Sequence, residues 1–358
     1  MVTTHSTNAM TPKERWLAVL NRESPDRIPM DYWGTEEATQ KVMAYLGVDN
    51  YWEFCERLHI DAVVSVSPTY VGPSLRDGYD YYGRGYQKVS YGTGVYEEVG
   101  DYPLAGFRTI EELEANYIWP TPDWFDFAVI PDQLKGKEQY PVRGGGSEPF
   151  YEYTLLRGIE QAYSDMVENP EFLHYCLGKL VDFFYEYTQR IFEQIPGQVT
   201  FTYISEDFGS QKNLLFSPKL IREFFIPGMR RMIALAREAG VYVFTHSDGA
   251  IRKIIPDLIE IGIDILNPIQ WRCTGMEREG LKRDFGDVLI FHGGVDNQYT
   301  LPFGTIVEVR DEVRRNLEIL GKGGGYILAP CHNIQAVGPP ENIVAMYETG
   351  YEYGRTLS

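Results

Sequence analysis

Residues 241–247 read VYVFTHS, a short run of β-branched and aromatic residues that ends in polar side chains. A run this short and this apolar is typical of a strand that is buried on both faces of a parallel sheet. The segment before it opens with Ser217 and Pro218 and ends near Gly240, which predicts a helix that Pro227 kinks or splits. This stretch therefore predicts one helix and the parallel strand that follows it.

Seven further runs of the same kind are separated by segments with helical punctuation. Eight strands that alternate with helices are the count of a closed (β/α)8 TIM barrel, which is the α/β fold that we expect. The alternative is an open doubly wound sheet, but neither Gly144–Gly146 nor Gly323–Gly325 has the spacing and position of its nucleotide fingerprint. The eight predicted strands are residues 27–33, 61–67, 140–146, 199–205, 241–247, 264–270, 288–294 and 326–331.

A single barrel domain accounts for residues 11–358, and residues 1–10 are expected to be poorly ordered. Thr11 and Pro12 predict a short N-terminal helix. Residues 68–139 form a tyrosine- and glycine-rich insertion after the second strand, which we expect to contain a β-hairpin. Such an insertion can form a lid over the carboxyl side of a barrel, or its tyrosines can pack a surface hairpin, and both interpretations stay open.

The composition excludes several classes of function. Of the 358 residues 44% are hydrophobic and 23% are charged, as in ordinary folded proteins, and the net charge is 33 − 51 = −18. A field of that sign repels nucleic acid and anionic membrane surfaces. No run approaches the roughly 18 apolar residues of a membrane span, and the polar start lacks the apolar core of a signal peptide, so we expect a cytoplasmic protein. Four scattered cysteines predict reduced thiols.

Polar residues follow most of the predicted strands, at the rim where barrel enzymes carry their functional groups. They include three of the six histidines and one of the four cysteines. By strand, they are Asp31 and Tyr32; Glu206 and Asp207; His246 and Asp248; Asn267 and Gln270; His292 and Asp296; and Cys331, His332 and Asn333.

The most specific pattern at this rim is His246-x-Asp248, because alternation along an extended segment points both side chains to the same side. Cys331 or His332 can complete a three-ligand site. A thiolate favours zinc, whereas two histidines and a carboxylate suit iron(II). The plainer interpretation is that His246 and Asp248 bond each other or cap a helix.

Several motifs together resemble the uroporphyrinogen decarboxylase superfamily. They cover nearly the whole chain from about Thr11 and are densest after residue 199. They are EDFGSQ at 206–211, Ser217-Pro218, His246-x-Asp248-Gly249, IDILNP at 263–268, PCHNIQ at 330–335 and PPEN at 339–342. The resemblance implies a (β/α)8 barrel with its active site in the mouth.

Two branches of that superfamily are relevant. The decarboxylases act on a tetrapyrrole without metal, through an arginine-rich N-terminal segment and an aspartate on strand two. Here no paired arginines follow Arg27 and Pro68 stands at the aspartate position, although His332 is similar to a decarboxylase histidine. The zinc-dependent cobamide methyltransferases have a His-x-Cys and a distant cysteine, which His246, Asp248 and Cys331 match with a carboxylate in place of the first thiolate.

The resemblance to the second branch predicts a methyltransferase that works with a corrinoid protein or methylcobamide on a small substrate. Zinc held by His246, Asp248 and Cys331 activates a substrate heteroatom as a Lewis acid. The expected catalytic residues are Glu206, Asp207 and His332. Residues expected to bind the substrate are Asp31, Tyr32, Arg143, Asn267, Gln270 and Asp296.

Two other functions stay open: a uroporphyrinogen decarboxylase, and a non-catalytic protein that binds a corrinoid or a tetrapyrrole. The oligomeric state is also open, a homo-oligomer included.

Overall fold

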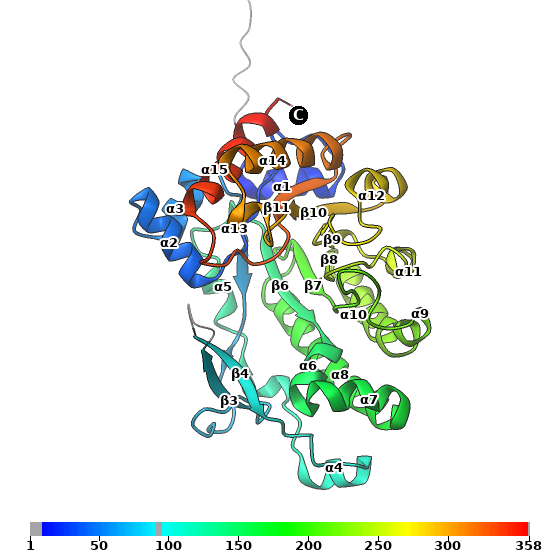
Figure 1. The fold of residues 1–358 in the computed structure, drawn as a ribbon. Coiled ribbons are helices and arrows are strands. Elements are labelled where there is room, and N and C mark those ends of the chain that lie inside the picture. Colours follow the sequence, from blue (N-terminus) through cyan, green and yellow to red (C-terminus); the bar gives the residue numbers. More distant parts are fainter. Residues whose placement is uncertain (1–8, 91–94, 357–358) are drawn as a thin grey trace, which may run out of the picture.

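The computed structural model describes residues 9–90 and 95–356, so most of the segment 1–10 lies outside the described residues. Seven parallel strands form one curled sheet in the order β1-β6-β7-β8-β9-β10-β11 (Figure 1). The chain is therefore an α/β protein. The strands are β1 (Val64–Val66), β6 (Val142–Ser147), β7 (Phe201–Ile204), β8 (Tyr242–His246), β9 (Ile265–Asn267), β10 (Ile290–Val295) and β11 (Tyr326–Pro330).

The first predicted strand, residues 27–33, lies between the two edges of this sheet. Met30 forms a parallel bridge with Leu328 of β11, and its carbonyl accepts a 2.7 Å hydrogen bond from the backbone N–H of Asp61, just before β1. The segment makes a single bridge rather than a regular ladder. One reason is that Pro29 has no N–H to donate, and another is that the N–H of Met30 donates instead to the Asp61 carboxylate.

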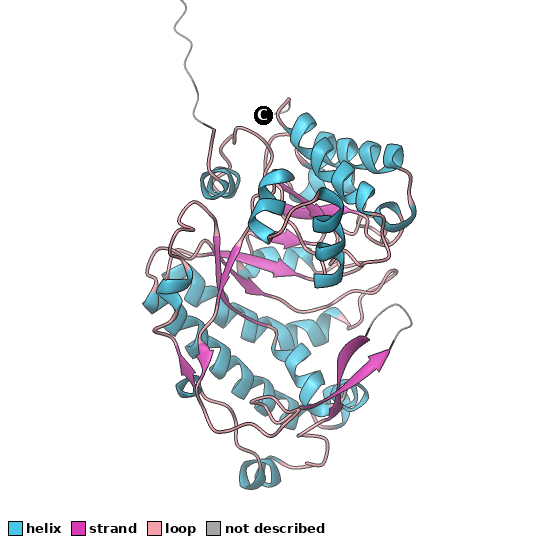
Figure 2. Ribbon diagram, turned by 90° about the vertical axis from the view of Figure 1, so that its left-hand side faces the viewer, coloured by secondary structure: helices cyan, strands magenta, loops and turns pink. Residues whose placement is uncertain are grey.

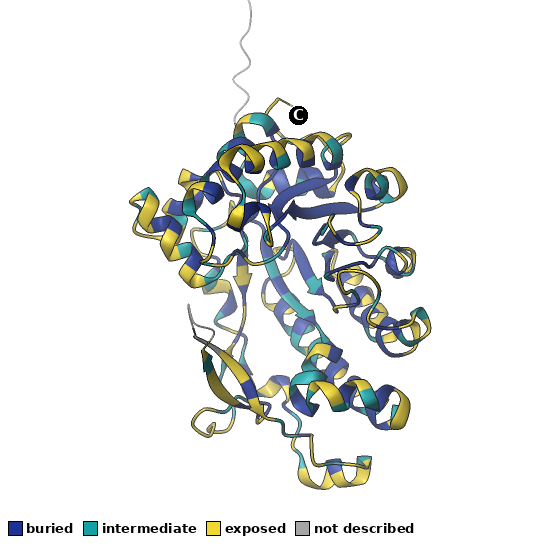
Figure 3. Cartoon of the chain, viewed as in Figure 1, coloured by how far each residue is buried: buried dark blue, intermediate teal, exposed yellow. Residues whose placement is uncertain are grey.

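Helices cover the outer surface of the sheet, and their outward faces are exposed while the strands are buried (Figure 3). The longest, α8, follows Asn169 at a first-turn proline, as its sequence predicts. None of the helices among the described residues is long and apolar enough to cross a membrane. The helices are α1 (Pro12–Leu20), α2 (Glu36–Leu46), α3 (Tyr51–Arg57), α4 (Ile110–Asn116), α5 (Ile130–Gln133), α6 (Pro149–Arg157), α7 (Ile159–Glu168), α8 (Pro170–Gln194), α9 (Pro218–Leu220), α10 (Ile226–Glu238), α11 (Ile255–Ile261), α12 (Arg278–Phe285), α13 (Thr300–Phe303), α14 (Ile306–Leu320) and α15 (Pro340–Gly354).

The helix predicted to open at Ser217 is split, as Pro227 predicts. A π-helical turn over Ile221–Phe225 separates α9 from α10. Pro227 lacks the N–H that would bond the carbonyl one turn back, and its ring crowds that carbonyl. The wider π turn accommodates both effects.

The insertion 68–139 adds two small antiparallel sheets (Figure 2). One pairs β2 (Thr69–Tyr70) with β5 (Phe125–Asp126), and the other pairs β3 (Gly85–Ser90) with β4 (Val95–Asp101). Tyr82 is buried, and its ring centroid lies 5.9 Å from that of Phe183 on α8. This tyrosine anchors the insertion to the rest of the molecule by packing.

The inside of the curled sheet is filled with side chains. Trp16 of α1 is fully buried there and stacks on Phe201 at 5.2 Å. Phe244 lies next, at 5.3 Å from Phe201. The carboxyl ends of the strands are where enzymes of this architecture place their chemistry.

Candidate metal and substrate site

Two histidines and an aspartate converge at the carboxyl ends of β8 and β11. Nε2 of His246 lies 3.7 Å from Oδ1 of Asp248, and Nε2 of His332 lies 3.9 Å from Oδ2 of Asp248. One ligand atom of each residue lies within 4.8 Å of the other two. Zinc with bonds of about 2.0–2.2 Å sets tetrahedral ligand atoms ~3.4 Å apart, so the three side chains must draw closer together to share one ion. The group fits a divalent cation.

A buried hydrogen-bond chain fixes which nitrogen of His246 faces this group. The Asp31 carboxylate can only accept, so Nε2 of His292 donates to its Oδ2 at 3.0 Å. Nδ1 of singly protonated His292 then accepts from the Asn267 amide at 2.7 Å. Oδ1 of Asn267 consequently accepts from Nδ1–H of His246 at 2.6 Å. The chain leaves Nε2 of His246 as a lone pair aimed at Asp248, the state that binds metal.

Asp248 is held from two sides. Gln270 donates to its Oδ1 at 3.0 Å and accepts from the N–H of Gly249 at 2.7 Å, so one amide fixes both residues. The backbone N–H of Asp248 donates to Asp207, whose Oδ1 also lies 3.8 Å from Nε2 of His246. Burial raises the pKa of Asp248, an effect that the two histidines oppose. Gln270 and Asp207 therefore support the predicted ligands.

The predicted third ligand, Cys331, faces away from this group. Its thiol donates to the carbonyl of Ile269 at 3.3 Å, and burial raises its pKa well above the ordinary value. His332, the next residue, is the one that reaches Asp248. The cause is the backbone after β11, where the N–H of Cys331 donates to Val295 and turns its side chain into the sheet. The structure therefore replaces Cys331 by His332 in the ligand group.

Glu206 does not line the large cavity near the ligand group, which is described below. Its carboxyl accepts the backbone N–H groups of Phe150 at 2.5 Å and Tyr151 at 3.1 Å, in the first turn of α6. Burial raises its pKa well above the usual range. The structure thus gives Glu206 a role in holding the start of a helix, where backbone N–H groups lack other partners.

Asp296 has a comparable structural role. Its Oδ2 accepts from the N–H of Thr300 at 3.0 Å, in the first turn of α13, and from Arg272 at 2.8 Å. Asn267 and Asp31, which were expected to bind substrate, belong to the hydrogen-bond chain that orients His246, and Asp31 also lines the large cavity.

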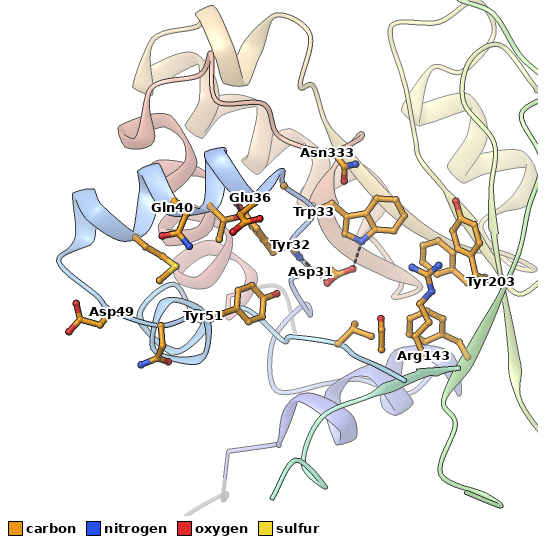
Figure 4. A pocket seen from close by; sticks show the side chains of 18 of the residues that line it. Asp31, Tyr32, Trp33, Glu36, Gln40, Asp49, Tyr51, Arg143, Tyr203 and Asn333 are labelled. Atoms are coloured by element: carbon orange, nitrogen blue, oxygen red, sulfur yellow. Dashed lines mark hydrogen bonds between the residues drawn. The ribbon is translucent and has the colours of Figure 1, made fainter. Parts of the chain in front are cut away.

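A cavity of about 770 Å³ lies beside this hydrogen-bond chain, between the N-terminal helices and the sheet (Figure 4). Its wall near the ligand group is aromatic, because Trp33 stacks on His246 at 5.8 Å and Tyr203 stacks on it at 6.0 Å. Trp33 is fixed by donating to Asp31 at 2.9 Å. Tyr32 and Arg143, both predicted from the sequence, line the same cavity.

Glu148 is a cavity residue that the sequence analysis missed. It lines the large cavity and an adjoining one of about 430 Å³. Burial raises its pKa to about 7, against the opposing effect of His246. The signal for it was the carboxyl end of the third strand, which the prediction ended at Gly146, one residue too early, so that Glu148 was not recognised as following the strand directly.

The family model for uroporphyrinogen decarboxylase (URO-D) matches residues 129–353 of this chain. The chain belongs to the uroporphyrinogen decarboxylase family. The match includes β6 to β11 and every member of the ligand group, so the family membership rests on the part of the chain that carries the site.

Relatives within this family are distant. The uroporphyrinogen decarboxylase of Psychromonas ingrahamii is 25% identical over 283 residues, covering 73% of this chain and 75% of that protein. That of Pseudomonas putida strain W619 is 28% identical over 294 residues, with the same two shares. A solved structure, a methyltransferase from Methanosarcina mazei, has a TM-score of 0.70 at 18% identity and covers 96% of this chain and 99% of its own. That likeness is one of fold.

Proposed function

We propose that this chain is a methyltransferase of the uroporphyrinogen decarboxylase family that holds zinc with His246, Asp248 and His332 and works with a corrinoid protein. The observation that carries the proposal is the convergence of these three side chains, with the Nε2 lone pair of His246 aimed into the group. The fold likeness to the Methanosarcina mazei methyltransferase supports it. We also infer that the 27–33 segment completes a (β/α)8 barrel.

When bound, zinc supplies Lewis acidity that stabilises an anionic oxygen or sulfur on the small substrate. The protein's own residues hold the ligand side chains in position and carry protons. Asn267 holds the His246 ring, and Gln270 holds the Asp248 carboxylate. Trp33 packs against the His246 ring, with the ring centroids 5.8 Å apart. Glu148, with a pKa near 7, holds a proton at the cavity wall for a departing heteroatom.

Metal analysis of the purified protein tests the ligand group. We expect bound zinc in the wild type and in Cys331→Ser, and its loss in His246→Ala and His332→Ala. Cys331→Ser is the matched control because it changes the neighbouring side chain, which faces away. Full metal content in both histidine variants contradicts the proposal, and bound iron in place of zinc changes the identity of the metal.

Methyl transfer is tested separately. Methylcobalamin or its demethylated form is mixed with the metal-loaded enzyme and a panel of methylated compounds and thiols, and the cobalamin absorption spectrum is followed. We expect a spectral change with the wild type that His332→Ala loses. A panel without any change, in protein that holds its metal, contradicts methyl transfer but leaves the metal site standing.

A second candidate, a uroporphyrinogen decarboxylase activity, is favoured by the names of the relatives from Psychromonas and Pseudomonas. Incubation with uroporphyrinogen separates the two functions. Formation of coproporphyrinogen by the metal-free protein favours the decarboxylase. An unchanged substrate favours the methyltransferase.

A further inference from the structure

Each buried arginine among the described residues is paired with an acidic side chain, whereas Arg143, which is half-buried and faces the cavity, is not. Arg143 makes no hydrogen bond or ion pair with any residue in the described ranges 9–90 and 95–356. The paired ones are Arg15 with Asp26 and Asp61, Arg27 with Asp61, Arg84 with Asp80 and Glu152, Arg157 with Asp165, and Arg278 with Glu312. A cation that is partly removed from water is costly without a partner, so Arg143 calls for a partner from outside the chain.

The position of Arg143 is fixed although its charge is unpaired. It lies on β6 between Ser65 and Phe201 of the neighbouring strands, and its guanidinium stacks on the ring of Tyr203 at 4.4 Å. The strand bulges directly after it, between Arg143 and Gly146. Bulges of this kind redirect side chains beside functional sites. Arg143 is therefore held in place before any ligand binds.

Arg143 faces open space rather than packed side chains. It lines both the 770 Å³ cavity and the adjoining 430 Å³ cavity, together with Ser65, Tyr203 and Glu148. In Figure 4 it lies beside Tyr203, at the opposite end of the cavity from Asp49 and Gln40. A ligand that fills the large cavity therefore meets the guanidinium at the end near β6 and β7.

The charges around Arg143 do not neutralise it. Asp31 is engaged with His292 and Trp33, at 3.0 and 2.9 Å. Burial raises the pKa of Glu148 to about 7, so this carboxyl is only partly ionised at neutral pH. Burial also lowers the pKa of Arg143, which is the mark of a desolvated cation. An anionic ligand supplies the missing charge.

We infer that Arg143 binds an anionic group of the substrate, a carboxylate, sulfonate or phosphonate, and that the substrate is a small anion. This inference rests on the proposed function for the identity of the reaction, but the anion site itself rests on Arg143, Tyr203 and the cavity. The chain carries a net charge of −18, which repels anions in general. An anionic ligand therefore needs a local cation such as Arg143 in its cavity, whereas a neutral or cationic ligand does not.

Isothermal titration calorimetry tests the inference on the protein as purified, with propionate, ethanesulfonate and ethylphosphonate as anionic probes and propionamide as the uncharged probe. We expect binding of at least one anion and weaker binding of the amide. Arg143→Gln is expected to weaken anion binding about tenfold or more, and Arg143→Lys to keep part of it because the charge stays. The probe that binds best identifies the anionic group. Arg230→Gln, at an exposed ion pair, is the control and should bind as the wild type does.

Three results overturn the inference: no anion binds up to millimolar concentrations, the amide binds as tightly as the anions, or Arg143→Gln binds the anions unchanged. Melting temperatures of the variants confirm that they are folded. Repeating the titration with His246→Ala separates the two proposals. Anion binding that persists in His246→Ala supports the Arg143 site even if metal binding fails, whereas binding that is lost in His246→Ala and kept in Arg143→Gln assigns the anion to the metal.

Discussion

The imidazole of His246 is tied through its Nδ1 atom to the side-chain oxygen of Asn267, 2.6 Å away in a fully buried position. Asn267 is itself held by His292, and His292 by Asp31. A ligand histidine whose far nitrogen is bonded in this way keeps a single tautomer and ring orientation. We therefore expect the metal affinity of the proposed site to depend on residues that do not touch the metal.

Asn267→Ala removes the acceptor for Nδ1–H of His246. We expect metal binding to weaken about 10–100-fold, the usual cost of losing such a supporting bond. A competition titration with a metal-binding dye measures it, and Asn116→Ala, at an exposed asparagine on α4, is the control. Unchanged metal affinity in a folded Asn267→Ala protein contradicts the role of the hydrogen-bond chain in orienting His246.

The pH dependence of stability follows from Glu148. Its pKa rises from the ordinary 4.5 to about 7 on folding, so the folded state binds more protons than the unfolded state between these values. Stability from this carboxyl is therefore full below pH ~4.5, falls as the pH rises to about 7, and stays low above it.

Glu148→Gln should remove that loss, making the variant more stable than the wild type at pH 8 by on the order of 2 kcal/mol and equal to it at pH 4. Urea unfolding at the two pH values measures the difference. Glu160→Gln, at an exposed position of α7, should show no such change. Equal pH profiles for wild type and Glu148→Gln contradict the prediction.

Glu206 is expected to matter for stability rather than for chemistry. Glu206→Ala leaves the N–H groups of Phe150 and Tyr151 without their acceptor, at a cost of about 1–3 kcal/mol. Glu206→Gln keeps one acceptor oxygen and should lose less stability and little activity. If Glu206→Gln is as stable as the wild type but inactive, the residue has a chemical role after all.

Asp61 is expected to be the most sensitive acidic residue for stability. Its buried carboxylate bonds Arg15, Arg27 and the N–H of Met30. Asp61→Ala leaves two buried guanidinium groups short of a partner, which costs about 3–5 kcal/mol. Asp182→Ala breaks an exposed pair with Arg231 and should cost no more than about 1 kcal/mol. Similar losses in both variants contradict the prediction.

The strands could be predicted because burial on both faces demands unbroken apolar runs. The positions of β6 to β11 agree with the predicted runs to within a few residues. His246 and Asp248 were also predictable, since strand alternation places residues two apart on one side. The motifs that resemble the uroporphyrinogen decarboxylase superfamily indicated the family, and the family model confirms it.

The choice between Cys331 and His332 could not be made from the sequence, because a shift of one residue at a strand end exchanges the two sides. It depends on where the ladder with β10 ends, at Pro330 and Val295. Glu148 was missed for a related reason. The three glycines before it weaken the apolar signal of the strand, and the bulge that they allow decides where the strand stops.

Asp31, the far end of the chain that orients His246, sits in the segment that joins β11 to β1 through Met30. We therefore expect the contacts of this segment with β11 and β1, the seam of the sheet, to be thermodynamically linked to His246 as the proposed metal ligand. Loosening these contacts should free His292 and then the His246 ring. Ion binding should in turn tighten the seam, and amide protons of residues 30 and 31 should exchange more slowly once the ion is bound. The N-terminal segment should thus report occupancy of the proposed metal site, to which it contributes no ligand.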